Sequence, residues 1–142
     1  MYVVRRAELR DMHSVIAIFA EAIGNALWLS PANRLKCNFA DVSVGEIVLV
    51  CCASDDEVLG FASIYEADSF VHHLYVAEHF QRRGVGTALL KSLEAWLRLP
   101  WRLKCVLGNE NALAFYSSLG WVEESRAQGT EGPDAILKWP AA

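Results

Sequence analysis

Two arginines and two closely spaced glycines open the stretch QRRGVGTALL, residues 81–90. Apolar residues then recur with helical spacing, so the glycines stand where a helix begins. The first turn of a helix exposes unpaired backbone N–H groups with partial positive charge, which attract anions. Glycines at 84 and 86 let a phosphate approach these groups, and Arg82 and Arg83 add charged donors. These residues predict a phosphate-binding loop, although a solvated basic turn explains them equally well on local grounds.

The loop matches neither of two familiar phosphate motifs. No Gly-Lys-Ser/Thr follows it, and Leu89 occupies the position of the third glycine in GxGxxG. Counting from Val85 at 100° per residue, the apolar residues of the following helix fall within an arc of about 140°. These are Leu89, Leu90, Leu93, Trp96 and Leu97. We expect a helix from residue 84 to about residue 99, packed on a sheet and ended by Pro100.

The rest of the chain alternates between strand and helix patterns. We expect strands at residues 2–6, 46–53, 58–65, 70–76, 101–107, 121–127 and 135–139, and helices at 9–26 and 109–120. Three successive strands joined by short turns predict an antiparallel meander, and a strand–helix–strand unit follows it. The chain therefore predicts one α+β domain, residues 1–142, around a mixed sheet.

Composition excludes several classes of function. The 142 residues are 54% hydrophobic with a mean hydropathy of +0.20, which is typical of a globular protein. A net charge of −4 argues against nucleic acid as the main partner. No apolar run reaches the roughly 20 residues of a membrane span, and the start lacks a signal-peptide pattern.

The cysteines and histidines show no metal-binding or disulfide pattern. The four cysteines, which are Cys37, Cys51, Cys52 and Cys105, lack CxxC spacing, so we expect buried, reduced thiols in a cytoplasmic protein. The four histidines lack a spacing such as HExxH, so we expect no metal site.

Two segments together resemble the GCN5-related N-acetyltransferase (GNAT) family. LYVAEHFQRRGVGTALL is similar to its Gln/Arg-x-x-Gly-x-Gly/Ala motif, and NENALAFYSSLGW (109–121) is similar to its downstream Asn…Ala…Phe-Tyr…Gly-aromatic segment. The resemblance implies the GNAT fold, a mostly antiparallel sheet of about six to seven strands flanked by about four helices. It also implies direct transfer of an acetyl group from acetyl-CoA to a primary amine in a ternary complex, and it permits a homodimer.

The resemblance also implies roles for individual residues. The strand before the glycine loop should diverge from the next strand, and the pantetheine arm should lie in the gap along Leu74, Tyr75 and Val76. Backbone groups of Leu74 and Val76 would hydrogen-bond this arm. Asn109 would bind the pantetheine region, and Tyr116 would stand beside the thioester sulfur, although it is otherwise an ordinary core aromatic. The expected pyrophosphate contacts are Arg82, Arg83, Gly84, Val85, Gly86 and Thr87.

The sequence offers several candidates for the general base. Relatives often carry a glutamate five positions before the asparagine, where this chain has Lys104, a cation in its usual state. His72 and His73 are candidates, and we expect only one to face the substrate because neighbouring strand residues point to opposite faces. The alternatives are a water activated by Glu66, Asp68 or Glu78, and an amine that arrives neutral.

Acceptor recognition is expected from residues 25–45 and from the loop QGTEGPD, residues 128–134. The first segment contains Trp28, Asn33, Arg34 and Asn38. A small-molecule amine is favoured over a protein N-terminus, because no features of a peptide groove are recognisable. Two rival functions are a non-catalytic acyl-CoA sensor and an interaction protein that shares only the fold.

Overall fold

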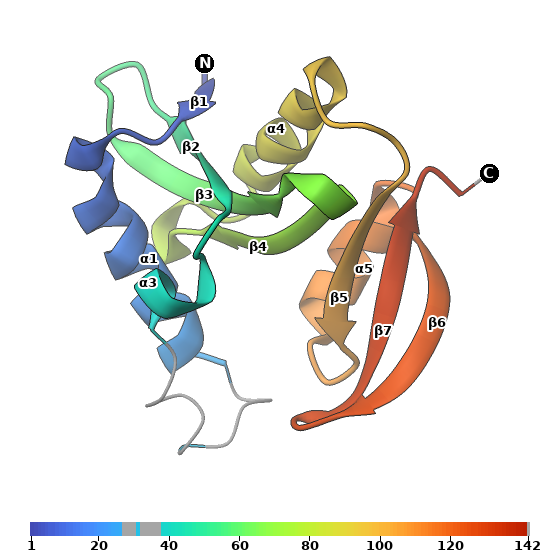
Figure 1. The fold of residues 1–142 in the computed structure, drawn as a ribbon. Helices are drawn as coiled ribbons and strands as arrows, with labels where there is room; N and C mark the ends of the chain where they lie inside the picture. The colour runs from blue at the N-terminus through green and yellow to red at the C-terminus, as the bar shows by residue number, and fades with distance from the viewer. Residues whose placement is uncertain (27–30, 32–37, 142) are drawn as a thin grey trace.

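Seven strands in the order β1-β2-β3-β4-β5-β7-β6 form one mixed sheet in the computed structural model, which describes residues 1–26, 31 and 38–141 (Figure 1). The strands are β1 (Val3–Arg6), β2 (Ile47–Cys52), β3 (Val58–Tyr65), β4 (Phe70–Val76), β5 (Trp101–Val106), β6 (Val122–Gly129) and β7 (Gly132–Trp139). The helices are α1 (Met12–Gly24), α3 (Phe39–Val42), α4 (Val85–Ser92) and α5 (Glu110–Ser118). This confirms the predicted α+β class and the sheet of about seven strands.

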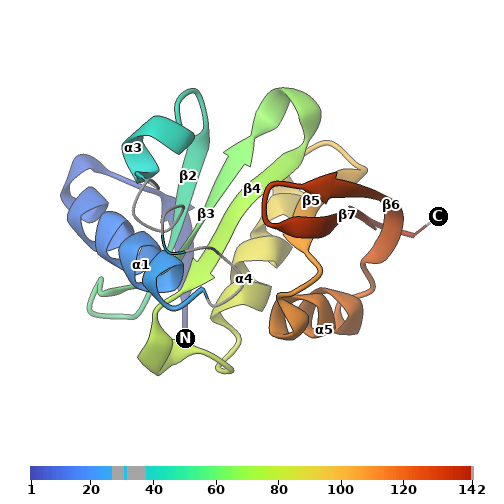
Figure 2. The same ribbon diagram turned by 90° about the horizontal axis from the view of Figure 1, so that it is seen from below.

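Each face of the sheet packs against its own pair of helices (Figure 2). One apolar cluster includes side chains of α4 and α5, and we call this side the α4/α5 face. A second cluster includes side chains of α1 and α3, and we call this side the α1/α3 face. Cys51 belongs to the first cluster and Cys52 to the second, as expected for neighbours in a strand. Cys51, Cys52 and Cys105 are buried and free, as predicted.

The strands β4 and β5 form the weak seam of the sheet. They are its one parallel pair, and they match at a single position, Phe70 with Arg102. A backbone hydrogen bond of 3.1 Å from Arg102 N to Ser69 O accompanies this match. By contrast, β5 and β7 pair from Trp101 to Val106. The strands β4 and β5 therefore diverge toward the end of β4, as the resemblance implied (Figure 1).

The helix α4 ends earlier than the sequence predicted. It stops at Ser92, and a 3-10 turn follows it, whereas the apolar pattern suggested a helix to about residue 99. The Leu93 carbonyl accepts the N–H groups of both Trp96 and Leu97, which tightens and ends the helix. Trp96 consequently lies 36% exposed rather than on the buried face, while Leu97 remains buried.

The prediction of a loop at residues 128–134 is wrong. The strands β6 and β7 run through this segment and leave only Thr130 and Glu131 as the turn. Gly132 follows with φ of 90°, a left-handed conformation that favours glycine in a tight hairpin. The chain therefore offers a short hairpin where we expected an open recognition loop.

Part of the expected acceptor segment lies outside the described residues. Trp28, Asn33, Arg34 and Cys37 belong to that part. Asn38 is described, and its side chain accepts a hydrogen bond of 2.9 Å from Ala40 N, which caps α3. No helix among residues 1–26, 31 and 38–141 is long and apolar enough to cross a membrane.

Candidate active site

The glycine loop forms an uncapped helix start. Gly84 is the N-cap of α4 with φ of 83°, and no side chain of residues 1–26, 31 or 38–141 caps the helix there by a hydrogen bond. Arg82 has a positive φ as well, 63°. The first helical bond runs from Ala88 N to Gly84 O, so the N–H groups of residues 85–87 precede the hydrogen-bonded ladder. Such a turn, beside two exposed arginines, suits an anion.

The two glycines of this loop have different functions. A side chain on Gly84 would meet nothing within 4 Å, so its glycine is needed for the left-handed backbone. A Cβ on Gly86 would lie 3.1 Å from the Phe115 ring of α5. Gly86 therefore permits α4 to pack closely on α5, which the sequence did not reveal.

The backbone of β4 presents Leu74 and Val76 to the gap beside β5. Ala77 N donates to Leu59 O, and hydrogen-bonded and non-bonded positions alternate along an antiparallel pair. Tyr75 is therefore bonded to β3, whereas the N–H and C=O groups of Leu74 and Val76 point toward β5. The Val76 carbonyl already accepts a bond of 3.2 Å from the Gln81 side chain.

Tyr116 lies in the core between α5 and the diverging strands. Its ring packs edge-on against Phe115 and Trp121 and is 9% exposed. Burial raises the pKa of its phenol well above the usual value, with smaller contributions from Cys105 of β5 and Tyr75 of β4. The hydroxyl therefore stays protonated near neutral pH and is suited to donate a hydrogen bond.

Asn109 begins α5 rather than standing free. Its side-chain oxygen accepts a bond of 3.2 Å from Ala112 N and so caps the helix. The predicted contact with pantetheine stays a prediction, and the side-chain N–H₂ group is the part that the cap leaves for it.

A β-bulge places both His72 and His73 on the same face of the sheet. The register with β3 shifts at this point, since Ser63 pairs with His73 and the next residue of β3 pairs with Val71. Val71 and Leu74 both pack into the cluster of the α4/α5 face, which leaves the two histidines between them on the other face. The expectation that His72 and His73 point to opposite faces is wrong, because a bulge breaks the alternation.

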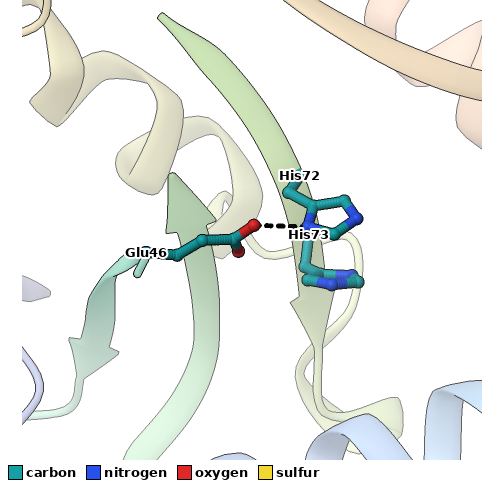
Figure 3. Close-up of side chains that lie close together, drawn as sticks. All are labelled: Glu46, His72 and His73. Carbon is teal, nitrogen blue, oxygen red and sulfur yellow. Dashed lines mark hydrogen bonds and ion pairs between the residues drawn. The ribbon is translucent and has the colours of Figure 1, made fainter. Parts of the chain in front are cut away.

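His72 forms a pair with Glu46, the residue that precedes β2 (Figure 3). His72 Nδ1 lies 2.5 Å from Glu46 Oε2, and the buried Ser63 hydroxyl donates to the other carboxylate oxygen. The Glu46 side chain is 6% exposed, whereas that of His72 is 41% exposed. The carboxylate therefore orients an imidazole that remains accessible from outside. Sequence reasoning missed Glu46, because it lies 26 positions from His72.

His73 is held neutral in an aromatic environment. Its ring makes edge contacts with Phe19 of α1 and Phe39 of α3, and it stacks on His72 with centroids 4.0 Å apart. Burial, and to a lesser degree His72, lowers the pKa of His73 from 6.5 to about 3. Its Nε2 is buried and has no hydrogen-bond partner among the described residues. His73 therefore lines the site as an uncharged ring.

The group of Glu46, His72 and His73 could also be considered for a metal, because its ligand atoms lie within 4.8 Å of one another. The lone pairs of an imidazole lie in the plane of its ring. The two rings are stacked with their planes 30° apart, so they share no ligand position without turning. The geometry favours a hydrogen-bonded pair over a metal centre.

The acidic alternatives lie in the 3-10 turns before and after β4. Glu66 and Asp68 are exposed in the 3-10 turn before β4. Glu78 follows β4, and its backbone N–H donates to the Glu21 side chain at 2.9 Å. Lys104 lies exposed on β5.

We expect acid to destabilise the fold through His73. Its pKa is lower in the folded than in the unfolded state, so the unfolded chain binds the extra proton between about pH 6.5 and 3 and stability falls as pH falls. The loss is about 1.6 kcal/mol between pH 6.5 and 5. Urea unfolding at both pH values checks this. His73→Phe should reduce the change in unfolding free energy between the two pH values, whereas His13→Asn, at an exposed position of α1, should leave that change as in wild type. An unchanged pH dependence in His73→Phe would contradict the expectation.

A tyrosine at the start of the chain anchors the glycine loop. The Tyr2 hydroxyl donates a bond of 2.8 Å to the Arg83 carbonyl. In a trans peptide the C=O and the following N–H point in opposite directions, so this bond also orients the Gly84 N–H. If this loop holds the pyrophosphate of CoA, as the resemblance implies, Tyr2→Phe should weaken CoA binding by about 2- to 10-fold, the value of one neutral hydrogen bond. Calorimetry with CoA and with pantetheine checks this, since a ligand without pyrophosphate should bind both proteins equally.

A model of the family described as "Acetyltransferase (GNAT) family" matches residues 12–121, which include the bulged histidines, the glycine loop and Tyr116. The chain belongs to the GNAT family. This confirms the family that the glycine loop and the NENALAFYSSLGW segment indicated together.

The GNAT chain is similar to two curated proteins with different acceptors. It is 31% identical over 103 residues to an L-methionine sulfoximine/L-methionine sulfone acetyltransferase of Pseudomonas paraeruginosa, over 63% of this chain and 60% of that protein. It is 34% identical over 89 residues to the peptidyl-lysine N-acetyltransferase YiaC of Escherichia coli, over 61% of this chain and 59% of that protein. The match thus spans about 60% of the length of these relatives.

The fold also matches solved GNAT structures. One is yncA of Salmonella typhimurium with its cofactor acetyl-CoA, at a TM-score of 0.70 and 20% identity, over 97% of this chain and 92% of that one. At this low identity, the structural match shows that the two chains share a fold.

Proposed function

We propose that this protein is an acetyl-CoA-dependent N-acetyltransferase, formed by one GNAT domain over residues 1–142. It transfers the acetyl group directly to a small primary amine in a ternary complex. The observation that carries the proposal is the glycine loop at the end of β4, beside the gap where β4 leaves β5. Family membership supports acetyl-CoA as the donor.

The donor would be held mainly by backbone groups. In the proposal, the N–H and C=O groups of Leu74 and Val76 bind the pantetheine arm in the gap. The first turn of α4, with Arg82 and Arg83, binds the pyrophosphate. Because these groups belong to a strand and a helix start, they are fixed before the ligand arrives, which reduces the entropy lost on binding.

The acceptor amine would lose its proton to His72. The amine nitrogen forms a bond to the acetyl carbon, the carbon–sulfur bond breaks, and its electron pair goes to sulfur. Glu46 holds Nδ1 of His72, so Nε2 is the nitrogen free to accept the proton. Because His73 is neutral, it places no second positive charge beside the His72 imidazole when that ring takes up the proton.

The departing sulfur would be stabilised by Tyr116. Since burial raises the pKa of this phenol, complete proton transfer to a thiolate is unfavourable, and a hydrogen bond is the role that remains.

A small-molecule acceptor is favoured over a protein terminus. The relative from Pseudomonas paraeruginosa acetylates small amino-acid analogues by its name, whereas YiaC acts on peptidyl-lysine. The expected cytoplasmic location is supported by the free thiols of Cys51, Cys52 and Cys105. A homodimer stays a prediction.

Two measurements test the proposal. CoA at about 100 times its Kd should stabilise the protein by about 2.7 kcal/mol, which is measurable as a rise in Tm. A panel of amines with acetyl-CoA, followed by release of free thiol, should then show turnover. CoA binding without turnover on any amine or peptide would favour the sensor, and no rise in Tm would exclude both CoA-dependent functions.

A further inference from the structure

Lys104 and His72 lie on the same side of the sheet, across the gap between β4 and β5. Along β5, Trp101, Leu103 and Cys105 are buried in the cluster of the α4/α5 face, so Lys104 faces the opposite side. The bulge turns His72 to this same side, which is the α1/α3 face. The parallel match of Phe70 with Arg102 places the two residues at corresponding positions of their strands.

The ammonium of Lys104 has no anionic partner in the described part of the chain. No ion pair within 4.0 Å is formed by it there, and it is exposed. The neighbouring cation of β5, Arg102, is engaged by both oxygens of Glu124 at 2.7 and 2.9 Å. On the paired strand, Ile136 lies opposite Lys104 and contributes no charge. The Lys104 charge is therefore available to a ligand, whereas that of Arg102 is not.

The two sides of the gap offer complementary groups. On the β4 side, the Glu46–His72 pair can accept a proton from an amine. On the β5 side, Lys104 can donate charge-assisted hydrogen bonds to an anion. A molecule that carries both an amine and a carboxylate satisfies both sides, and a simple monoamine satisfies one.

We propose that Lys104 binds the carboxylate of an amino-acid acceptor whose amine faces His72. The proposal rests on the proposed function and narrows it to a substrate class, α-amino acids and close analogues. In this role Lys104 selects the acceptor and leaves the proton transfer to His72.

Paired substrates test the proposal. Each L-amino acid is compared with its amide, which keeps the amine and side chain and removes the carboxylate charge. Because the amide's amine is less basic, the informative quantity is the change in the acid-to-amide ratio of kcat/KM on mutation. Lys104→Met should lower this ratio about tenfold, as expected for the loss of one charged hydrogen bond at an exposed site. Lys104→Glu should lower it further.

Matched controls separate this effect from general damage. Lys138→Met removes a cation from the same face of the neighbouring strand and should leave the ratio unchanged. The KM for acetyl-CoA and the rise in Tm with CoA should match wild type in all three variants. An equal loss of kcat/KM for acids and amides in Lys104→Met would overturn the substrate class alone. If wild type turns over neither compound, the proposed function is overturned as well.

Discussion

Replacing His72 with asparagine is expected to lower kcat/KM by about 10²- to 10⁴-fold at neutral pH, the usual contribution of a general base. Asparagine retains hydrogen-bonding capacity toward Glu46 but cannot accept a proton. Initial rates of thiol release at neutral pH measure this effect.

Two further variants show whether the effect belongs to the pair. Glu46→Gln should lower kcat while His72 is present and add little to His72→Asn, because the carboxylate acts through the imidazole. His13→Asn, an exposed histidine of α1, should match wild type. Wild-type activity in His72→Asn would show that the amine arrives neutral or that another group takes its proton.

The second large effect is expected from Tyr116→Phe, with kcat lowered about 100-fold, as for removal of one donor from a site of developing charge. The ring and its contacts with Phe115 and Trp121 remain, so folding should be retained. CoA affinity should change less than twofold, because the hydrogen bond strengthens only as charge develops on sulfur.

Steady-state kinetics and calorimetry with CoA separate these two quantities for Tyr116→Phe. Tyr65→Phe, which removes a hydroxyl from a side chain that is 43% exposed, provides the control and should match wild type. If kcat is unchanged and only stability falls in Tyr116→Phe, the tyrosine is a core aromatic and sulfur is stabilised in another way.

The features that the sequence predicted well are those set by neighbours in the chain. The bounds of β3 and β4 agree with the apolar runs 58–65 and 70–76 because turn-forming residues flank both. The start of α4 was predicted because glycines precede its apolar pattern. Tyr116 was found through a resemblance, since a tyrosine on a short helix carries no functional signal of its own.

The features that the sequence did not predict depend on contacts between distant segments. The partnership of Glu46 with His72 arises only when β2, β3 and β4 align. Just past the early end of α4, the Leu97 carbonyl accepts a hydrogen bond of 3.1 Å from the Trp101 side chain of β5, a contact that the periodic pattern does not reveal. The length of the β6–β7 hairpin depends on cross-strand pairing up to Gly129 and Gly132, although the segment between them reads as a loop.

The bulge at His72 also sets the phase of the rest of β4. One extra residue between Val71 and Leu74 reverses which side chains and which backbone groups point each way from there to Val76. Without it, the backbone groups of Leu74 and Val76 would point toward β3 and those of Tyr75 toward the gap. Deleting one histidine is therefore expected to impair the donor and acceptor sides together, because a single register shift aligns both.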